Sequence, residues 1–218
     1  VYEGHCVQTV EGAVYAAELR KIESEQRIRQ VPYDNTKPVH AAWDLGFADQ
    51  TAIWMFQVYP WEYRLIDYLE GSGQAIHYYL KELQSRGYVW GRDYLPHDAR
   101  ARNLATGKSI EELMRAAGRS VTIVPQLSIA DGINAARTIM AQCWFDADKC
   151  ADGLQALRHY RWAPVLASGI QKREPVHDTY SHGADSFRAM AVGVKPPAAS
   201  ERPKQTFYQP EVYSGVWS

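Results

Sequence analysis

Some aspartates in this sequence stand where solubility alone does not explain an acidic side chain. Asp44 ends the apolar run at residues 39–43 and precedes Leu45 and Gly46. A carboxylate in an apolar strand costs several kcal/mol unless it is paired or binds a metal ion. Gly46 allows close approach by a ligand or by another backbone segment. Asp44 is therefore a candidate catalytic residue, with a strand-end Asp that accepts turn hydrogen bonds as the alternative.

Asp98 and Asp185 stand at comparable positions. Asp98, in YLPHDA, lies at the carboxyl end of a predicted strand, the edge at which α/β sheets place their sites. Asp185 is three residues after His182 near the start of a predicted helix, so both side chains project from one helical face. Asp178 precedes this helix, and capping of the helix N-terminus explains it equally well.

Three carboxylates without a nearby cysteine favour a hard divalent cation, Mg²⁺ or Mn²⁺, over structural zinc. Two such ions about 3.5–4 Å apart would activate a water and stabilise the leaving oxygen of a phosphodiester. We therefore predict that Asp44, Asp98 and Asp185 converge on one site and bind metal for hydrolysis of nucleic acid. Asp178 and His182 are candidates for accessory groups.

Two groups of basic residues are candidates for DNA contact. The first lies around a predicted helix N-terminus, where an anion is favoured, and a solvated basic loop is the alternative. The second is interleaved with Tyr160 and Trp162, a mixture that non-specific nucleic-acid grooves use. Cations at a helix end would explain Arg158 and Arg161 without DNA. The predicted DNA contacts are Arg100, Arg102, Lys108, Arg161, Lys172 and Arg173.

The segment Ala105-Thr-Gly107-Lys108-Ser109 ends like a phosphate-binding Walker A loop, G-x-x-x-x-G-K-[ST]. The first glycine of that motif would fall at position 102, which is Arg102. Without that glycine the loop cannot cradle phosphates as ATPases do. We therefore expect no ATP hydrolysis by this chain.

The elements that must position these residues follow from hydrophobic periodicity. A helix is predicted within residues 1–30, with Thr9 as its cap and Ile28 on its apolar side, before a turn-rich linker. Predicted strands cover 39–45, 51–60, 63–69, a segment ending near 93–97, and a buried run at 120–125. Predicted helices cover 75–86, 109–117, 129–144, 151–160 and 181–192. Ser109 and Glu112 form a capping box for the second of these helices.

The order of these elements predicts the fold class. Three strands with short connections indicate an antiparallel meander, and the strands that follow alternate with helices. Such a chain forms an α/β mixed sheet with helices on both faces, the ribonuclease-H-like architecture.

Composition limits the classes of protein that remain. The chain has 218 residues, of which 46% are hydrophobic and 22% charged, which excludes a disordered chain and fits one well-buried domain. It has no apolar stretch of 18 residues and no signal-peptide pattern, and its first residue, Val1, favours an excised or processed product. The net charge of −1 requires any DNA binding to come from a local patch. Three cysteines without a C-x-x-C pair favour a reducing compartment and no structural zinc.

Three motifs, taken in order, resemble the nuclease domain of tailed-phage terminase large subunits. They are Trp43-Asp-Leu-Gly46 with Asp49 and Thr51-Ala52; Pro96-His-Asp98-Ala; and His177-Asp178 with Ser181-His182-Gly-Ala-Asp185-Ser-Phe-Arg188. The resemblance covers about residues 12–192. It implies a nuclease domain at 37–194, preceded by a helix and linker at 1–36 and followed by a Pro-rich tail at 195–218.

The resemblance also implies an activity and its partners. Members of that family have a ribonuclease-H-like fold and cut concatemeric double-stranded viral DNA during genome packaging, with two metal ions. By motif position, Asp44, Asp98 and Asp185 match the metal-binding acids, and His182 matches a histidine of some members. Asp178 would be an extra ligand or a proton-transfer group, and residues 163–175 resemble a β-hairpin over the active site.

The implied partners are double-stranded DNA, the portal protein, the small terminase subunit and an N-terminal packaging ATPase that this chain lacks. DNA translocation is therefore not expected of this chain, and the implied location is the host cytoplasm, at the procapsid portal. Two alternatives remain. A ribonuclease-H-like resolvase or integrase would use the same acids on branched or host DNA, and a non-catalytic module would bind DNA or portal without cutting.

Overall fold

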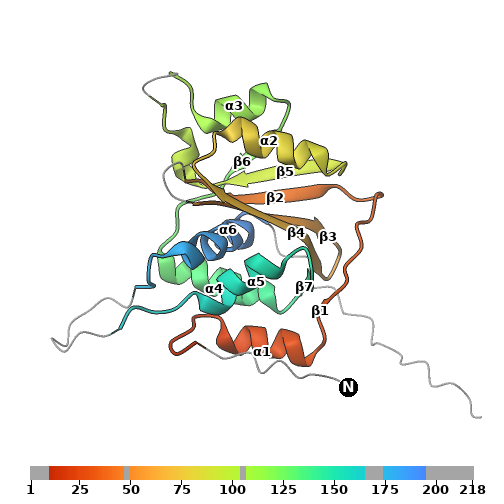
Figure 1. Cartoon of the computed structure of the whole chain (residues 1–218), viewed down its shortest axis with the longest axis vertical. Coiled ribbons are helices and arrows are strands. Elements are labelled where there is room, and N and C mark those ends of the chain that lie inside the picture. Colours follow the sequence, from red (N-terminus) through yellow and green to blue (C-terminus); the bar gives the residue numbers. More distant parts are fainter. Residues whose placement is uncertain (1–9, 47–49, 104–106, 165–173, 195–218) are drawn as a thin grey trace, which may run out of the picture.

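The protein is described by a computed structural model that places residues 10–46, 50–103, 107–164 and 174–194. Within these residues one mixed sheet of seven strands runs through the molecule (Figure 1), in the order β1-β7-β4-β3-β2-β5-β6. The strands are β1 (Ile28–Arg29), β2 (Val39–Asp44), β3 (Gln50–Val58), β4 (Tyr63–Ser72), β5 (Trp90–Leu95), β6 (Ser120–Ile123) and β7 (Cys143–Asp146).

The antiparallel meander predicted from the sequence is confirmed. Strand β3 pairs antiparallel with both β2 and β4, while the β2–β5, β5–β6, β4–β7 and β1–β7 pairs are parallel. All but the two end residues of β3 are buried, because helices cover both faces of the sheet. The mixed sheet and its coverage confirm the ribonuclease-H-like α/β architecture.

Helices lie in two layers, one on each face of the sheet. In Figure 1, α2 (Ile76–Ser85) and α3 (Ile110–Ala116) lie on one side. On the other side lie α1 (Ala16–Ser24), α4 (Ile129–Met140), α5 (Ala151–His159) and α6 (Thr179–Gly193). The one-turn 3₁₀ helix η1 (His97–Arg100) follows β5. The predicted capping box is present at α3, where Ser109 and Glu112 exchange hydrogen bonds. None of the described helices is long and apolar enough to span a membrane.

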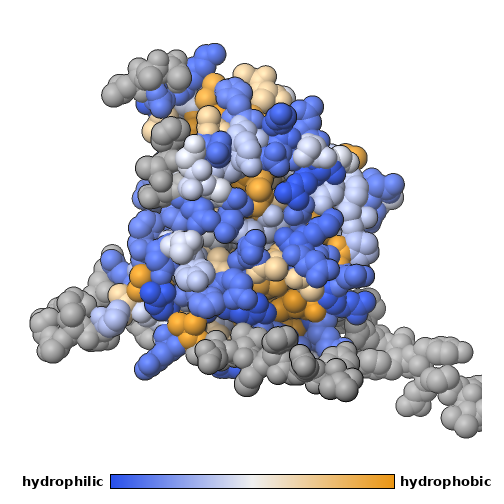
Figure 2. Space-filling view, viewed as in Figure 1, coloured by the Kyte–Doolittle hydropathy of each residue, from blue (hydrophilic) through white to orange (hydrophobic). Residues whose placement is uncertain are grey.

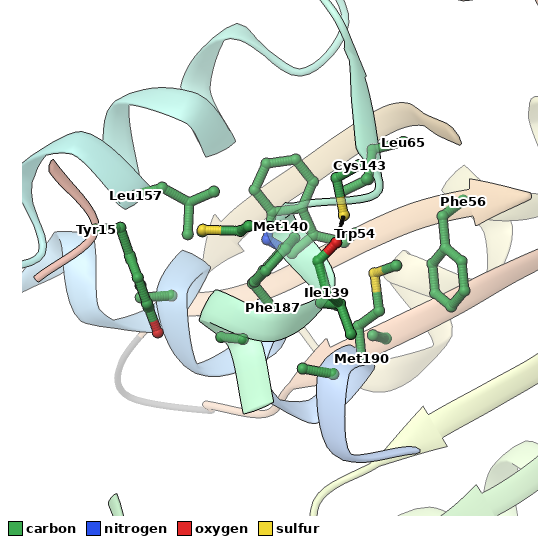
Figure 3. Close-up of a cluster of buried hydrophobic side chains, with 14 of the residues drawn as sticks. Tyr15, Trp54, Phe56, Leu65, Ile139, Met140, Cys143, Leu157, Phe187 and Met190 are labelled. Carbon is green, nitrogen blue, oxygen red and sulfur yellow. Dashed lines mark hydrogen bonds between the residues drawn. The ribbon is translucent and has the colours of Figure 1, made fainter. Parts of the chain in front are cut away.

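The larger core lies under α1, α4, α5 and α6. Figure 3 shows Trp54 of β3 packed against Phe187 of α6, with ring centroids 5.8 Å apart. Tyr15, Leu19 and Ile22 of the N-terminal helix region belong to this same core. The segment assigned to residues 1–36 therefore contributes to the core of the 37–194 region, and the tail at 195–218 lies outside the described residues.

The face of the molecule seen in Figure 2 is mostly hydrophilic. Figure 2 shows polar residues over most of the visible face, with only small apolar areas between them. The large apolar side chains of the described chain that remain exposed are Trp61, Tyr78, Val89, Leu127 and Ile129. Two of these, Leu127 and Ile129, line the pocket described below.

Three expectations about elements are wrong, two about the type of an element and one about its burial. The helix predicted across 129–144 ends at Met140, and Cys143–Asp146 forms β7, where buried Cys143 and Phe145 pair with β4. Ile28, predicted on the first helix, lies in β1 beside Phe145. In both places pairing with a neighbouring strand overrides the local helical pattern. The run at 120–125 is a half-buried edge strand rather than a buried one, and Thr9 lies outside the described residues.

Helix α6 packs closely on the sheet, and a glycine makes this possible. A Cβ added to Gly183 would stand 2.7 Å from the hydroxyl of Tyr68 and 2.6 Å from Cβ of Ala156. The backbone carbonyl of Gly183 accepts a 2.8 Å hydrogen bond from Nε1 of Trp54. One turn on, Oγ of Ser186 donates to the carbonyl of Ala42 over 2.8 Å. These contacts fix the height of α6 above β2 and β3.

Gly183→Ala is expected to destabilise the chain by roughly 1–3 kcal/mol, because the added methyl group has no room. Gly132→Ala is the matched control in another helix, since its Cβ would meet the nearest atom at an ordinary 3.4 Å. That control should be neutral or slightly stabilising, because Ala favours a helix over Gly by about 1 kcal/mol. Urea unfolding of both variants measures the difference, and equal stability of the two would contradict the packing constraint.

Candidate metal-binding site

A pocket of about 270 Å³ opens at the carboxyl ends of β2 and β5, and Asp44, Asp98 and Asp185 all line it. Each acid comes from a different element: Asp44 ends β2, Asp98 lies in η1 after β5, and Asp185 projects from α6. Residues 124–129, between β6 and α4, form another wall. The structure thus places the three predicted acids at one site, although 54 and 87 residues separate successive members in the sequence (98 − 44 and 185 − 98).

Asp44 is half-buried and already has a partner. Its Oδ2 lies 2.9 Å from Nδ1 of His182, and because a carboxylate can only accept, the imidazole donates this hydrogen bond. His182 itself is buried on the first turns of α6. The sequence predicts His182 as an accessory group next to the acids. In the structure His182 contacts Asp44, and this hydrogen bond orients the Asp44 carboxylate.

The surroundings of Asp185 shift the pKa of its carboxyl. Burial raises the pKa of its carboxyl to about 6, the charge of Arg188 opposes the shift, and the charge of Asp44 adds to it. Nη2 of Arg188, one turn further along α6, stands 2.7 Å from Oδ1 of Asp185. A carboxyl with a raised pKa in a pocket lined by other acids is typical of a functional site.

Asp98 differs from the other two acids because it is exposed. Within the described ranges, no three Asp, Glu, His or Cys side chains are close enough together to hold an ion. The donor set nevertheless fits a hard divalent cation, because three carboxylates line one pocket and one of them is kept out of bulk water. Binding of a cation would therefore have to draw the carboxylates closer together.

Asp178 does not line this pocket, and its carboxylate has partners elsewhere. Its Oδ1 accepts the backbone N–H of Tyr180 over 3.0 Å, which caps α6, and its Oδ2 accepts from Nη1 of Arg161 over 2.7 Å. Both of its oxygens thus have partners. The capping interpretation of Asp178 is confirmed, while an accessory role in proton transfer stays a prediction.

The first basic group lies on the loop that carries Asp98. Arg100 and Arg102 pair with Glu111 and Glu112 of α3, at 3.2 and 3.4 Å, yet their side chains remain 68% and 73% exposed. Lys108 is exposed just before the cap of α3. Surface ion pairs of this kind are weak, so phosphate could displace the glutamates. Contact between DNA and these three residues stays a prediction.

Only part of the second basic group lies within the described residues. Arg161 pairs with Asp178, whereas Lys172 and Arg173 lie outside the described residues, as do 165–173 in general and Asp49. The ends of the 163–175 segment pair antiparallel, since the N–H of Ala163 donates to the carbonyl of Glu174 over 2.9 Å. Tyr160 is buried and stacks on Tyr15, so the expectation that it interleaves with nucleic acid is wrong.

The structure also shows an acid that the sequence prediction overlooked. Asp93 of β5 is fully buried, accepts from Nε1 of Trp43 over 2.9 Å, and forms two 2.8 Å hydrogen bonds with Arg119. The guanidinium of Arg119 also stacks over Trp90, 4.3 Å from the ring centroid. Asp93, paired with Arg119, thus holds Trp43 at the end of β2, next to Asp44. Arg188, present in the third motif without an assigned role, is the other omission, and its i, i+3 spacing from Asp185 was the available indication.

The fold is shared with large terminases of bacteriophages. The nuclease of the thermophilic phage G20c with bound magnesium has a TM-score of 0.58 and 15% identity, over 83% of this chain and 97% of that one. The P22 nuclease domain has a TM-score of 0.55 and 16% identity, over 78% and 88%. The large terminase of a second thermophilic bacteriophage has a TM-score of 0.62 and 16% identity, over 77% of this chain.

This chain spans 42% of the length of that large terminase. Its sequence matches no protein-family profile and no curated protein. The likeness is therefore one of fold, and it agrees with the resemblance found in the three motifs.

The raised pKa of Asp185 predicts a dependence of stability on pH. The folded chain takes up a proton at this carboxyl near pH 6, whereas the unfolded chain takes it up near 3.8, so the group's destabilising effect appears as pH rises through this interval. Asp185→Asn should therefore stabilise the metal-free chain at pH 7.5 by at most about 3 kcal/mol, and by much less at pH 4. Urea unfolding in EDTA measures this.

Asp98→Asn is the control for that comparison, because Asp98 is exposed and should change stability little at either pH. A loss of stability in Asp185→Asn at pH 7.5 would show that the buried carboxylate is a net stabilising group and would contradict the prediction.

Proposed function

We propose that this chain is a metal-dependent endonuclease of the large-terminase type, which cuts concatemeric double-stranded viral DNA during packaging. The observation that carries the proposal is the convergence of Asp44, Asp98 and Asp185 in one pocket of a ribonuclease-H-like sheet. Carboxylates gathered from two strand ends and a helix are what two-metal phosphodiester hydrolysis requires of a protein.

In this proposal Asp44, Asp98 and Asp185 would hold the divalent cations, Mg²⁺ or Mn²⁺, in a two-ion site. The bound cations would supply an activated water and stabilise charge on the leaving oxygen of the phosphodiester. His182 keeps one oxygen of Asp44 fixed by its hydrogen bond. Arg100, Arg102 and Lys108, on the loop next to Asp98, would bind the DNA backbone, with Arg161, Lys172 and Arg173 as further contacts.

Structural neighbours support divalent-metal dependence. The G20c nuclease was solved with magnesium and, in another structure with a TM-score of 0.54 and 18% identity, with cobalt. Both ions are divalent, which agrees with the oxygen donors of the present pocket. Cations held by carboxylates would act on the phosphodiester, which carries no sequence information, so we propose little sequence preference.

The packaging context is also part of the proposal. Since the chain spans about two fifths of a large terminase with the same fold, we infer that it works as one part of a larger packaging enzyme. The inferred partners are an ATPase domain preceding this region, the portal protein and the small terminase subunit, with action at the procapsid portal in the host cytoplasm.

Metal-dependent cleavage tests the proposal directly. The purified chain should cut linear and supercoiled plasmid with Mg²⁺ or Mn²⁺ and should lose this activity in EDTA. Asp44→Ala, Asp98→Ala and Asp185→Ala should each be inactive and folded, because each removes a direct ligand. Asp178→Ala should lose only about 10–100-fold, as is typical of a group outside the ligand set.

Nicking rates and circular dichroism of the four variants provide the measurement. Undiminished cutting in EDTA, or near-normal activity in Asp185→Ala with none in Asp178→Ala, would contradict the assignment. Strong preference for a four-way junction over plasmid would favour a resolvase, and DNA binding without any cutting would favour a non-catalytic module.

The salt dependence of DNA binding tests the first basic group. Neutralising Arg100, Arg102 and Lys108 together should weaken binding to linear duplex. It should also flatten the log–log dependence of affinity on salt by roughly one unit for each phosphate that the variant no longer neutralises. The matched control neutralises Arg29, Lys81 and Arg92, basic residues that do not line the acidic pocket. An unchanged slope in the first variant would leave its residues as a solvated loop.

A further inference from the structure

Arg188 faces one of the two carboxylate oxygens of Asp185. The side chains of Arg188 and Asp185 are 18% and 27% exposed, and both residues line the acidic pocket. Oδ1 of Asp185, which faces Arg188 at 2.7 Å, has almost no accessible surface and no hydrogen bond from any described group. Since Oδ1 is turned inward while the residue lines the pocket, Oδ2 is the oxygen presented to a ligand there.

Arg188 is in turn enclosed by other elements. A Cβ on Gly132 of α4 would come within 3.4 Å of Cδ of Arg188, so the arginine stem packs on a glycine. Burial raises the pKa of the hydroxyls of Tyr15 and Tyr160, and the charge of Arg188 opposes this rise in both. Tyr15 is fully buried, and its hydroxyl, like Nη1 of Arg188, has no hydrogen-bond partner in the described part of the chain.

We propose that Arg188 is a positioning residue for the metal centre. It holds Oδ1 of Asp185 so that Oδ2 is presented to the divalent cation. The inference rests on the proposed function, because it needs Asp185 to be a metal ligand. It goes beyond that function because it assigns a role to Arg188, which contributes no carboxylate.

Two effects of Arg188 oppose one another. Its positive charge disfavours a second cation nearby, while its short ion pair with Oδ1 restricts the rotation of the Asp185 carboxylate. The pocket is open to water, which screens the repulsion, so we expect the positioning effect to dominate. Loss of Arg188 should then weaken metal binding, whereas a purely electrostatic role predicts tighter binding.

Calorimetric titration of the full chain with Mn²⁺, without DNA, separates these outcomes. Arg188→Met should bind Mn²⁺ about 10–100-fold more weakly, the usual effect of losing a group that orients a ligand. Arg188→Lys should also bind more weakly than wild type, because a flexible stem that ends in an ammonium group does not hold Oδ1 as the guanidinium does.

Arg158→Met is the matched control, since Arg158 is 17% exposed, pairs with Glu23 at 2.9 Å and does not line the pocket. It should leave Mn²⁺ affinity unchanged. Unchanged or tighter binding in Arg188→Met, or equal weakening in Arg158→Met, would overturn the proposal. If Arg188→Met does not fold, wild-type affinity in Arg188→Lys would overturn it.

Asp185→Asn distinguishes this failure from a failure of the proposed function. If Asp185→Asn binds Mn²⁺ as the wild type does, then Asp185 is not a ligand and the metal-site assignment itself is wrong. If Asp185→Asn loses binding while Arg188→Met does not, only the role of Arg188 is wrong.

Discussion

The close approach of α6 to the central strands is the constraint on which the site depends. Gly183 leaves room for Tyr68 and accepts a hydrogen bond from Trp54, so the helix backbone lies almost directly on the sheet. At that height His182 reaches Asp44 at the end of β2, and Asp185 lines the same pocket. A larger residue at position 183 would lift the helix and separate these groups. Close packing of α6 on the sheet thus determines the geometry of the acids.

The buried and half-buried acids of this molecule differ in how completely their charge is compensated. Asp93 is fully enclosed, and Arg119 with Trp43 satisfies both of its oxygens, so its charge is compensated permanently. Asp44 and Asp185 each have one partner and line a pocket that solvent can enter. An incompletely compensated carboxylate favours a cation, which is why the second kind of acid is suited to metal binding.

The sequence predicted the meander and the three acids because those signals are local. Residues 51–58 are rich in β-branched and aromatic side chains, and Asp44 and Asp98 stand at strand ends. The pairing of β7 with β4 and the ion pairs of Arg161 and Arg158 join residues far apart in the chain, so no local pattern contains them. Asp93 and Asp98 are both acids at or just after the same strand, so the sequence alone does not distinguish their roles. Only the packing of Arg119 separates the structural acid from the candidate ligand.

The central claim is that Asp44, Asp98 and Asp185 bind divalent metal at one site. Anomalous diffraction from a crystal of this chain soaked in Mn²⁺ tests it most directly, because manganese positions appear without any assumption about activity. The account predicts anomalous density in the pocket at the carboxyl ends of β2 and β5, within coordination distance of oxygens from all three aspartates. Density absent from that pocket, with an ion bound instead at Asp178 or elsewhere on the surface, would contradict it.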